Sequence, residues 1–336
     1  MPKLSHRPRL IITFPLLVLM ALITVACGGP DEAIAPTSDV TAIPAAPPDK
    51  LSIFYTADTR GHIDPCNCSA GMAGGIARRT AYIENQAPDH FLLVDAGDVT
   101  AGAREWELLE LEYILKGYAA MGYHAVNVGH REIQVGAEGL AKLRTQFPNF
   151  VSANIRDASG DLIFEPYRIV TLAGGYRVAI LGVADNTLQD DEIGAGLRLD
   201  APDQAVAKFL PEVSEQSDLV VLLAFANEER LQSLAEEFIG LDVIVGGDVA
   251  QPSGEALQRN RSVVVYNTDK GKSMGRLDLA LVDGGHAVVA NEVTMLLEDI
   301  ADDPDAAAIV EAFKLEQVNR NFQDYKKDDE EGLTAL

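Results

Sequence analysis

The side chains that could do chemistry in this sequence stand at the ends of short apolar runs. Six of these runs end on a polar residue, namely Asp58, Asp98, His130, Asn227, Asp248 and Thr268. In open α/β proteins, ligands bind at the carboxyl ends of buried strands. The six positions therefore predict one shared site of carboxylate, imidazole, amide and hydroxyl groups.

A Cys-x-Cys pair follows the first of these runs. Cys66 and Cys68 lie in a glycine-rich stretch, Gly61–Gly75, which we expect to be a long loop. Nearby cations would lower the pKa of the thiols, a disulfide between them would be strained, and two thiols can bind a soft metal. The pair is either a reactive thiol site or two incidental loop cysteines.

Apolar periodicity predicts an α/β fold in which βα units alternate with antiparallel hairpins. Such a chain is expected to form two stacked mixed sheets flanked by helices, a four-layer α/β/β/α sandwich. We expect strands at 51–57, 90–94, 125–128, 150–153, 167–171, 176–183, 219–225, 243–245, 263–267, 275–282 and 287–296, and helices at 76–86, 105–121, 137–147, 203–214, 228–238 and 305–319.

The first 26 residues have the features of a bacterial lipoprotein signal peptide. Basic residues precede an apolar run, Leu10–Val25, and Thr24-Val25-Ala26-Cys27 resembles a lipobox in which Cys27 is lipidated. An ordinary signal peptide or an uncleaved anchor is the alternative. We expect a cell-envelope protein that is attached to the membrane by lipid on its extracytoplasmic face.

The rest of the chain divides into three parts. Residues 27–50 combine the lipidated cysteine with a disordered linker rich in Pro and Ala. Residues 51–300 are expected to fold as one domain, and residues 301–336 as a C-terminal helix with an acidic tail. The formal net charge is −24, which disfavours nucleic acid as a partner.

Several motifs, in order and spacing, resemble the calcineurin-like metallophosphoesterases, in particular the N-terminal domain of 5′-nucleotidases and UDP-sugar hydrolases. They are Thr56–His62, Gly74–Arg78, Leu93–Asp98, Asn127–Glu132, Ser152–Asn154 and Gly271–Asp278. The resemblance implies the sandwich fold and a site in which two divalent cations clamp the attacking and leaving oxygens.

Carried over residue by residue, the resemblance leaves that metal site incomplete. Asp58, Asp98, His130 and Asp248 fall at ligand positions and are able to bind one divalent or soft metal ion. The remaining ligand positions hold Arg60, Phe225 and Ala250, which cannot bind a metal, and Arg131 replaces the histidine that acts in the transition state. No full dinuclear centre is expected.

These charged residues allow three interpretations. Arg60 and Arg131 are either charge partners that neutralise Asp58 and Asp98 in a relic site, or ligands for an oxyanion. Asp98 and Asp248 could alternatively cap following helices.

The Cys-x-Cys pair also resembles a nucleotidase-like subgroup that carries Cys-x-Cys, or selenocysteine-x-Cys, in this loop. The resemblance places Cys66 and Cys68 near Arg60 and Arg131, and it implies a multihaem cytochrome as a redox partner. The first hypothesis is thus a tethered protein with a thiol redox or soft-metal site. The second is a hydrolase with a remodelled metal centre, and the third is a pseudoenzyme that binds a ligand or partner.

Overall fold

The computed structural model describes residues 48–68 and 71–322, which all belong to the compact unit Pro44–Leu336. The side chains of Asn67 and Cys68 are not part of this description. The predicted signal peptide, the lipidation site Cys27, almost all of the linker and the acidic tail at 323–336 lie outside the described residues.

The first large sheet has six strands in the order β16-β15-β1-β4-β5-β6. Strand β1 is central, since it pairs with β4 in parallel and with β15 in antiparallel orientation. The strands are β1 (Lys50–Thr56), β4 (Phe91–Asp95), β5 (Ala125–Asn127), β6 (Phe150–Val151), β15 (Ser273–Val282) and β16 (Gly285–Met295).

The second large sheet has the order β13-β14-β12-β11-β9-β8 and is also mixed. Strands β9, β11, β12 and β14 run parallel, and the two edge strands are antiparallel to their neighbours. The strands are β8 (Tyr167–Thr171), β9 (Arg177–Ala184), β11 (Leu219–Phe225), β12 (Val243–Gly247), β13 (Leu257–Arg259) and β14 (Ser262–Tyr266).

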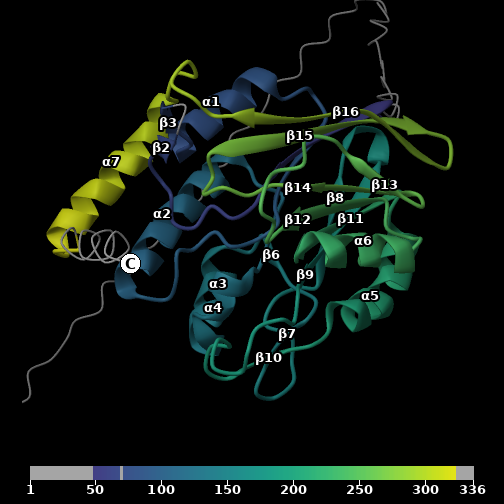
Figure 1. Ribbon diagram of the computed structural model, residues 1–336, viewed down its shortest axis with the longest axis horizontal. Coiled ribbons are helices and arrows are strands. Elements are labelled where there is room, and N and C mark those ends of the chain that lie inside the picture. Colours follow the sequence, from purple (N-terminus) through teal and green to yellow (C-terminus); the bar gives the residue numbers. More distant parts are fainter. Residues whose placement is uncertain (1–47, 69–70, 323–336) are drawn as a thin grey trace, which may run out of the picture. The chain divides into compact units, whose positions relative to one another are not determined.

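Helices cover the outer face of each sheet, as Figure 1 shows. The first sheet is covered by α1, α2 and α7 together with α3 and α4, and the second by α5 and α6. The helices are α1 (Ile76–Gln86), α2 (Glu105–Met121), α3 (His130–Ile133), α4 (Gly136–Gln146), α5 (Pro202–Gln216), α6 (Glu228–Glu237) and α7 (Pro304–Asn319).

The side-chain alternation of the strands creates three hydrophobic layers. In β1, Ile53 packs between the two sheets, whereas the adjacent Phe54 packs against the helices of the first sheet. In β11, Val221 faces the first sheet and Leu222 faces α5 and α6. This period of two confirms the predicted α/β/β/α sandwich of two mixed sheets.

Short elements that carry little apolar signal were not predicted. The stretch expected to be loop contains a hairpin, β2 (Cys66–Cys68) with β3 (Gly71–Ala73). A second small pair joins β7 (Ile155–Asp157) to β10 (Leu197–Leu199). In the described part of the chain, no helix is both long enough and apolar enough to cross a membrane.

Candidate functional site

Three aspartates at strand ends share an uncommon backbone conformation. Asp58, Asp98 and Asp248 each have φ 59°, in the left-handed region that non-glycine residues seldom adopt. None of them is the N-cap residue of a helix. Helix α2 is the next helix after Asp98 and has Arg104 as its N-cap, and strand β13 is the next element after Asp248. The prediction that Asp98 and Asp248 are helix N-caps is therefore wrong, although Asp98 Oδ1 accepts from the Arg131 amide in the first turn of α3. The strained turns mark this edge of the sheets as a candidate site.

The loops after β1 and β4 are held together by main-chain hydrogen bonds, and the loop after β5 lies close to Asp98. The amide of Asp58 donates to the Gly97 carbonyl at 2.8 Å, and the amide of Arg60 donates to the Asp98 carbonyl at 2.9 Å. A Cβ atom on Gly129 would lie 2.4 Å from Asp98 Oδ1. Glycine at position 129 is thus needed for the carboxylate of Asp98 to lie over the β5 loop.

Asp58 is bound by an arginine and a hydroxyl. Its side chain is almost fully buried, and Arg60 Nε donates to Oδ1 in an ion pair. Thr268 Oγ1 donates to Oδ2 at 2.7 Å, so both carboxylate oxygens have partners. Thr268 follows β14, which means that both large sheets contribute to the environment of Asp58.

Asp98 has a similar environment on the neighbouring loop. The amide of Arg131 donates to Asp98 Oδ1 at 2.8 Å, and Arg131 Nε lies 3.5 Å from Oδ2. The guanidinium also donates to the Ala101 carbonyl at 2.6 Å. Burial, then the nearby carboxylates of Glu132 and Asp58, raise the pKa of Asp98 well above its usual range, and Arg131 opposes that shift.

A buried glutamate ties the two loops together. The carboxylate of Glu132 accepts hydrogen bonds from the amides of Asp98, Thr100 and Gly129 at 2.9, 2.7 and 2.9 Å. Burial raises the pKa of Glu132 to about 7, although these three donors favour its ionised form. Glu132 therefore positions the turn that carries Asp98.

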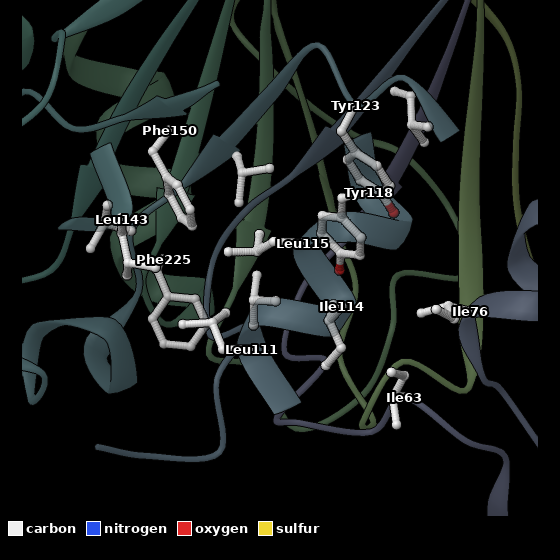
Figure 2. Close-up of a cluster of buried hydrophobic side chains, with 14 of the residues drawn as sticks. Ile63, Ile76, Leu111, Ile114, Leu115, Tyr118, Tyr123, Leu143, Phe150 and Phe225 are labelled. Carbon is white, nitrogen blue, oxygen red and sulfur yellow. The ribbon is translucent and has the colours of Figure 1, made fainter. Parts of the chain in front are cut away.

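The imidazole of His130 contacts a backbone carbonyl and a phenyl ring. His130 Nε2 lies 3.0 Å from the carbonyl oxygen of Asp185, which can only accept, so this nitrogen carries the proton. Phe225, at the end of β11, packs edge-on against the imidazole with 5.1 Å between ring centroids. Phe225 is 1% exposed and lies in the same apolar cluster as Leu111 and Leu143 (Figure 2).

The last two ligand positions that the resemblance implies lie after β12. The predicted ligand Asp248 is exposed there, and so is Ala250, which cannot bind a metal. In residues 48–68 and 71–322, no three His, Cys, Asp or Glu side chains are grouped so as to hold a metal ion. With arginine on both buried aspartates and carbon at position 225, these residues do not fit a dinuclear metal pair.

The Cys66–Cys68 strand lies beside the start of α1. The amide of Met72, in the partner strand, donates to Glu298 Oε1 at 3.3 Å, and Arg78 donates to the Met72 carbonyl at 2.6 Å. The next residue but one, Gly74, donates its amide to the Leu296 carbonyl at 2.9 Å. Cys66 is half-buried in this hairpin, and its predicted proximity to the two site arginines stays a prediction.

A fully buried arginine, Arg79, is hydrogen-bonded to the turn that carries Asp58 and Arg60. Arg79 donates to Tyr118 Oη at 2.7 Å and to Thr59 Oγ1 at 3.3 Å. Tyr118 Oη donates in turn to Asp95 at 2.8 Å. Since Thr59 lies between Asp58 and Arg60, this network fixes the turn that pairs them.

Sequence reasoning missed several of these contacts. Thr268 is one of the predicted strand-end residues, but its bond to Asp58 is not evident from the sequence. Glu132 lies in the Asn127–Glu132 motif, which gives it no role of its own. Asp185 follows β9, so the strand-end signal that found the other residues could have found it. Arg79 could not have been found, because nothing in the sequence distinguishes a buried arginine of α1 from an exposed one.

The fold is that of the calcineurin-like phosphoesterases. YfkN from Bacillus subtilis, a calcineurin-like phosphoesterase, superposes with a TM-score of 0.65 at 20% identity, over 82% of this chain and 99% of that one. No family model matches the sequence.

Within that class the resemblance is to 5′-nucleotidases. Bovine 5′-nucleotidase (Bos taurus) is 25% identical over 326 residues, which cover 84% of this chain and 56% of the relative. A 5′-nucleotidase precursor from Thermus thermophilus superposes with a TM-score of 0.70 at 24% identity, covering 82% of this chain and 60% of that one. The chain spans about half the length of the curated relatives that it matches.

Proposed function

We propose that this chain is a lipid-anchored, extracytoplasmic protein in which a 5′-nucleotidase-like fold no longer works as a regular nucleotidase. The observation that carries the proposal is the pairing of Asp58 with Arg60 and of Asp98 with Arg131. A two-metal hydrolase needs these carboxylates for its cations. Guanidinium groups on the same oxygens compete with metal binding and compensate the buried charges instead.

Nucleotide hydrolysis tests this part of the proposal. Phosphate release from AMP is measured with Mn²⁺, Zn²⁺ or Co²⁺, using wild type, Asp98→Ala and Asp283→Ala, a change on the exposed β15–β16 turn. Removing one donor to a transition state typically costs about 10²–10³ in rate, and this site has lost several. We expect all three proteins to give the same background rate. Metal-dependent release that only Asp98→Ala abolishes would establish the remodelled hydrolase instead.

The thiol pair is the proposed source of activity. Two residues of a strand advance the chain by about 6.6 Å, at the upper limit of roughly 4.4–6.8 Å between the Cα atoms of a disulfide. Since Cys66 and Cys68 both pair with β3, closing a disulfide requires the hairpin to leave its regular geometry. Such a disulfide is easily reduced, which suits redox exchange or, in the reduced form, binding of a soft metal.

Redox titration against glutathione tests the thiol proposal. We expect a reduction potential above about −300 mV, because inert structural disulfides have potentials below that value. We also expect the thiols to be alkylated with a pKa below the ordinary value of about 8.5. The Cys66→Ser/Cys68→Ser variant should lose both signals and keep the melting temperature. A lower reduction potential, or an alkylation pKa near the ordinary value, would mean that the two cysteines are incidental. The hypothesis of a pseudoenzyme that binds a ligand or partner would then be favoured.

The proposed location follows from the N-terminal sequence, and the proposed partner follows from the resemblance at the Cys-x-Cys loop. Cys27 would carry the lipid, and a multihaem cytochrome is the redox partner that the resemblance implies. Incorporation of a labelled fatty acid into the full chain in a bacterial host, and its loss in Cys27→Ala, tests the anchor. Labelling that survives Cys27→Ala would contradict it.

A further inference from the structure

A pocket behind the candidate site is not explained by the proposed function. It lies between α2 and the loop from α4 to β6, and its volume is about 120 Å³. Its deep wall includes Leu115, Val126 and Phe150, each 2% exposed. Figure 2 shows Leu115 and Phe150 in the same part of the core as the two tyrosines that complete the wall.

The tyrosines present their rings and not their hydroxyls. Tyr118 and Tyr123 are stacked, with 3.9 Å between ring centroids and 9° between ring planes. Tyr118 Oη donates to Asp95 at 2.8 Å, and Tyr123 Oη lies 2.9 Å from Thr56 Oγ1, on the sheet side. Because both hydroxyls already have partners there, the wall makes no demand for hydrogen bonds from a ligand.

The opposite side of the pocket reaches solvent. Ala119, Gln146 and Pro148 line the pocket and are exposed, so they form its mouth. Asn149 Nδ2 donates to the Tyr123 carbonyl at 2.7 Å and ties the loop to the end of α2. None of the residues that line the pocket is charged. A charged ligand would lose its hydration without compensation, whereas a neutral one would not.

We propose that this pocket binds a neutral ligand with the size of a single aromatic ring. Its volume is close to that of apolar cavities of roughly 150 Å³ that bind benzene. Aromatic rings pack favourably in offset or edge-on arrangements at roughly 4.5–7 Å between centroids, and Tyr118, Tyr123 and Phe150 offer such partners. The proposal is independent of any chemistry at Asp58, Asp98 or the cysteines.

Two ligands of matched size test the chemistry of the pocket on the wild-type protein. Benzyl alcohol and benzoate are titrated separately, and binding is followed by ligand-observed NMR at neutral pH. We expect saturable binding of benzyl alcohol and binding of benzoate at least about tenfold weaker, because only benzoate must be desolvated as an ion. Equal affinities, or no saturable binding of benzyl alcohol, would overturn the proposal.

A matched pair of substitutions locates the binding. Ala119→Leu extends a side chain at the mouth, whereas Ala120→Leu makes the same change at the next exposed position of α2, outside the pocket lining. We expect Ala119→Leu to weaken benzyl alcohol binding by at least about tenfold, since roughly three methyl-sized groups would occupy the ring's space. Ala120→Leu should bind like wild type. Equal binding by the two variants would place the ligand elsewhere and refute the assignment.

Discussion

Replacing Arg60 with alanine is the most direct perturbation of the Asp58 environment. The change removes a charged hydrogen bond from a carboxylate that is 2% exposed. Hydrogen bonds to charged groups contribute about 1.5–3 kcal/mol, and breaking a fully buried pair costs about 3–5 kcal/mol. The Arg60 side chain is 34% exposed, so water can reach Asp58 in the variant and replace part of the lost interaction. Thr268 keeps its bond to Asp58. We therefore expect a loss of about 2 kcal/mol.

Urea denaturation and thermal melting measure this loss. A change of 2 kcal/mol corresponds to a shift of about 4–8 °C in a domain of this size. Arg320→Ala is the control, because it removes an arginine from a short but solvent-exposed i,i+4 pair with Glu316 and should cost about 0.3–0.5 kcal/mol.

A double-mutant cycle separates the charge pair from other effects of the substitution. Asp58→Asn removes the charge that Arg60 compensates, so adding it to Arg60→Ala should restore about 1–2 kcal/mol relative to the sum of the single changes. Additive costs would refute the reasoning, because they would mean that Arg60 does not stabilise the fold through Asp58.

Three other changes test separate parts of the structure. Phe225→Ala should lower the free energy of unfolding, measured by urea denaturation, by about 3–5 kcal/mol, because loss of the buried ring leaves a cavity beside the imidazole. A decrease below about 1 kcal/mol would mean that the surrounding side chains fill the space and no cavity remains. Gly129→Ala places a Cβ 2.3 Å from the Asp98 amide and should cost about 1–3 kcal/mol, whereas Gly254→Ala, with no atom within 4 Å, should stay within about 0.5 kcal/mol. Burial raises the pKa of Tyr55 from 10.0 to about 12, so between these pH values the unfolded chain releases a proton that the folded chain keeps. The free energy of unfolding should therefore fall as the pH rises from 10 to 12, and it should fall less in Tyr55→Phe. The same dependence on pH in wild type and Tyr55→Phe would count against the burial argument.

The sequence predicted the elements that bury continuous apolar runs. Helices α1 and α2 and strand β11 have the predicted bounds, since the helices are long and β11 is a continuous buried apolar run; the short edge strand β8 also has its predicted bounds, although none of its residues is buried. The β2–β3 hairpin was expected to be loop, because its three-residue strands contain too few apolar positions to show a period. Hairpins of this kind are specified by contacts with distant segments, here by Glu298 and Leu296.

The candidate site was predicted at the level of strand ends but not at the level of contacts. The pairing of Asp58 with Arg60 is local and could be proposed from residue types alone. The contact of Asp58 with Thr268 spans 210 positions and depends on both sheets. The packing of Phe225 on His130 depends in the same way on how the two sheets stack, which no local pattern encodes.

Metal binding by the purified protein tests the central claim most directly. The protein is incubated with excess Zn²⁺ or Mn²⁺, passed through a desalting column and analysed by mass spectrometry for bound metal, alongside Asp98→Ala. With Arg60 and Arg131 on the two buried aspartates, we expect the same content of metal in both proteins and no dinuclear centre. Two equivalents of metal in the wild type that are lost in Asp98→Ala would contradict the account.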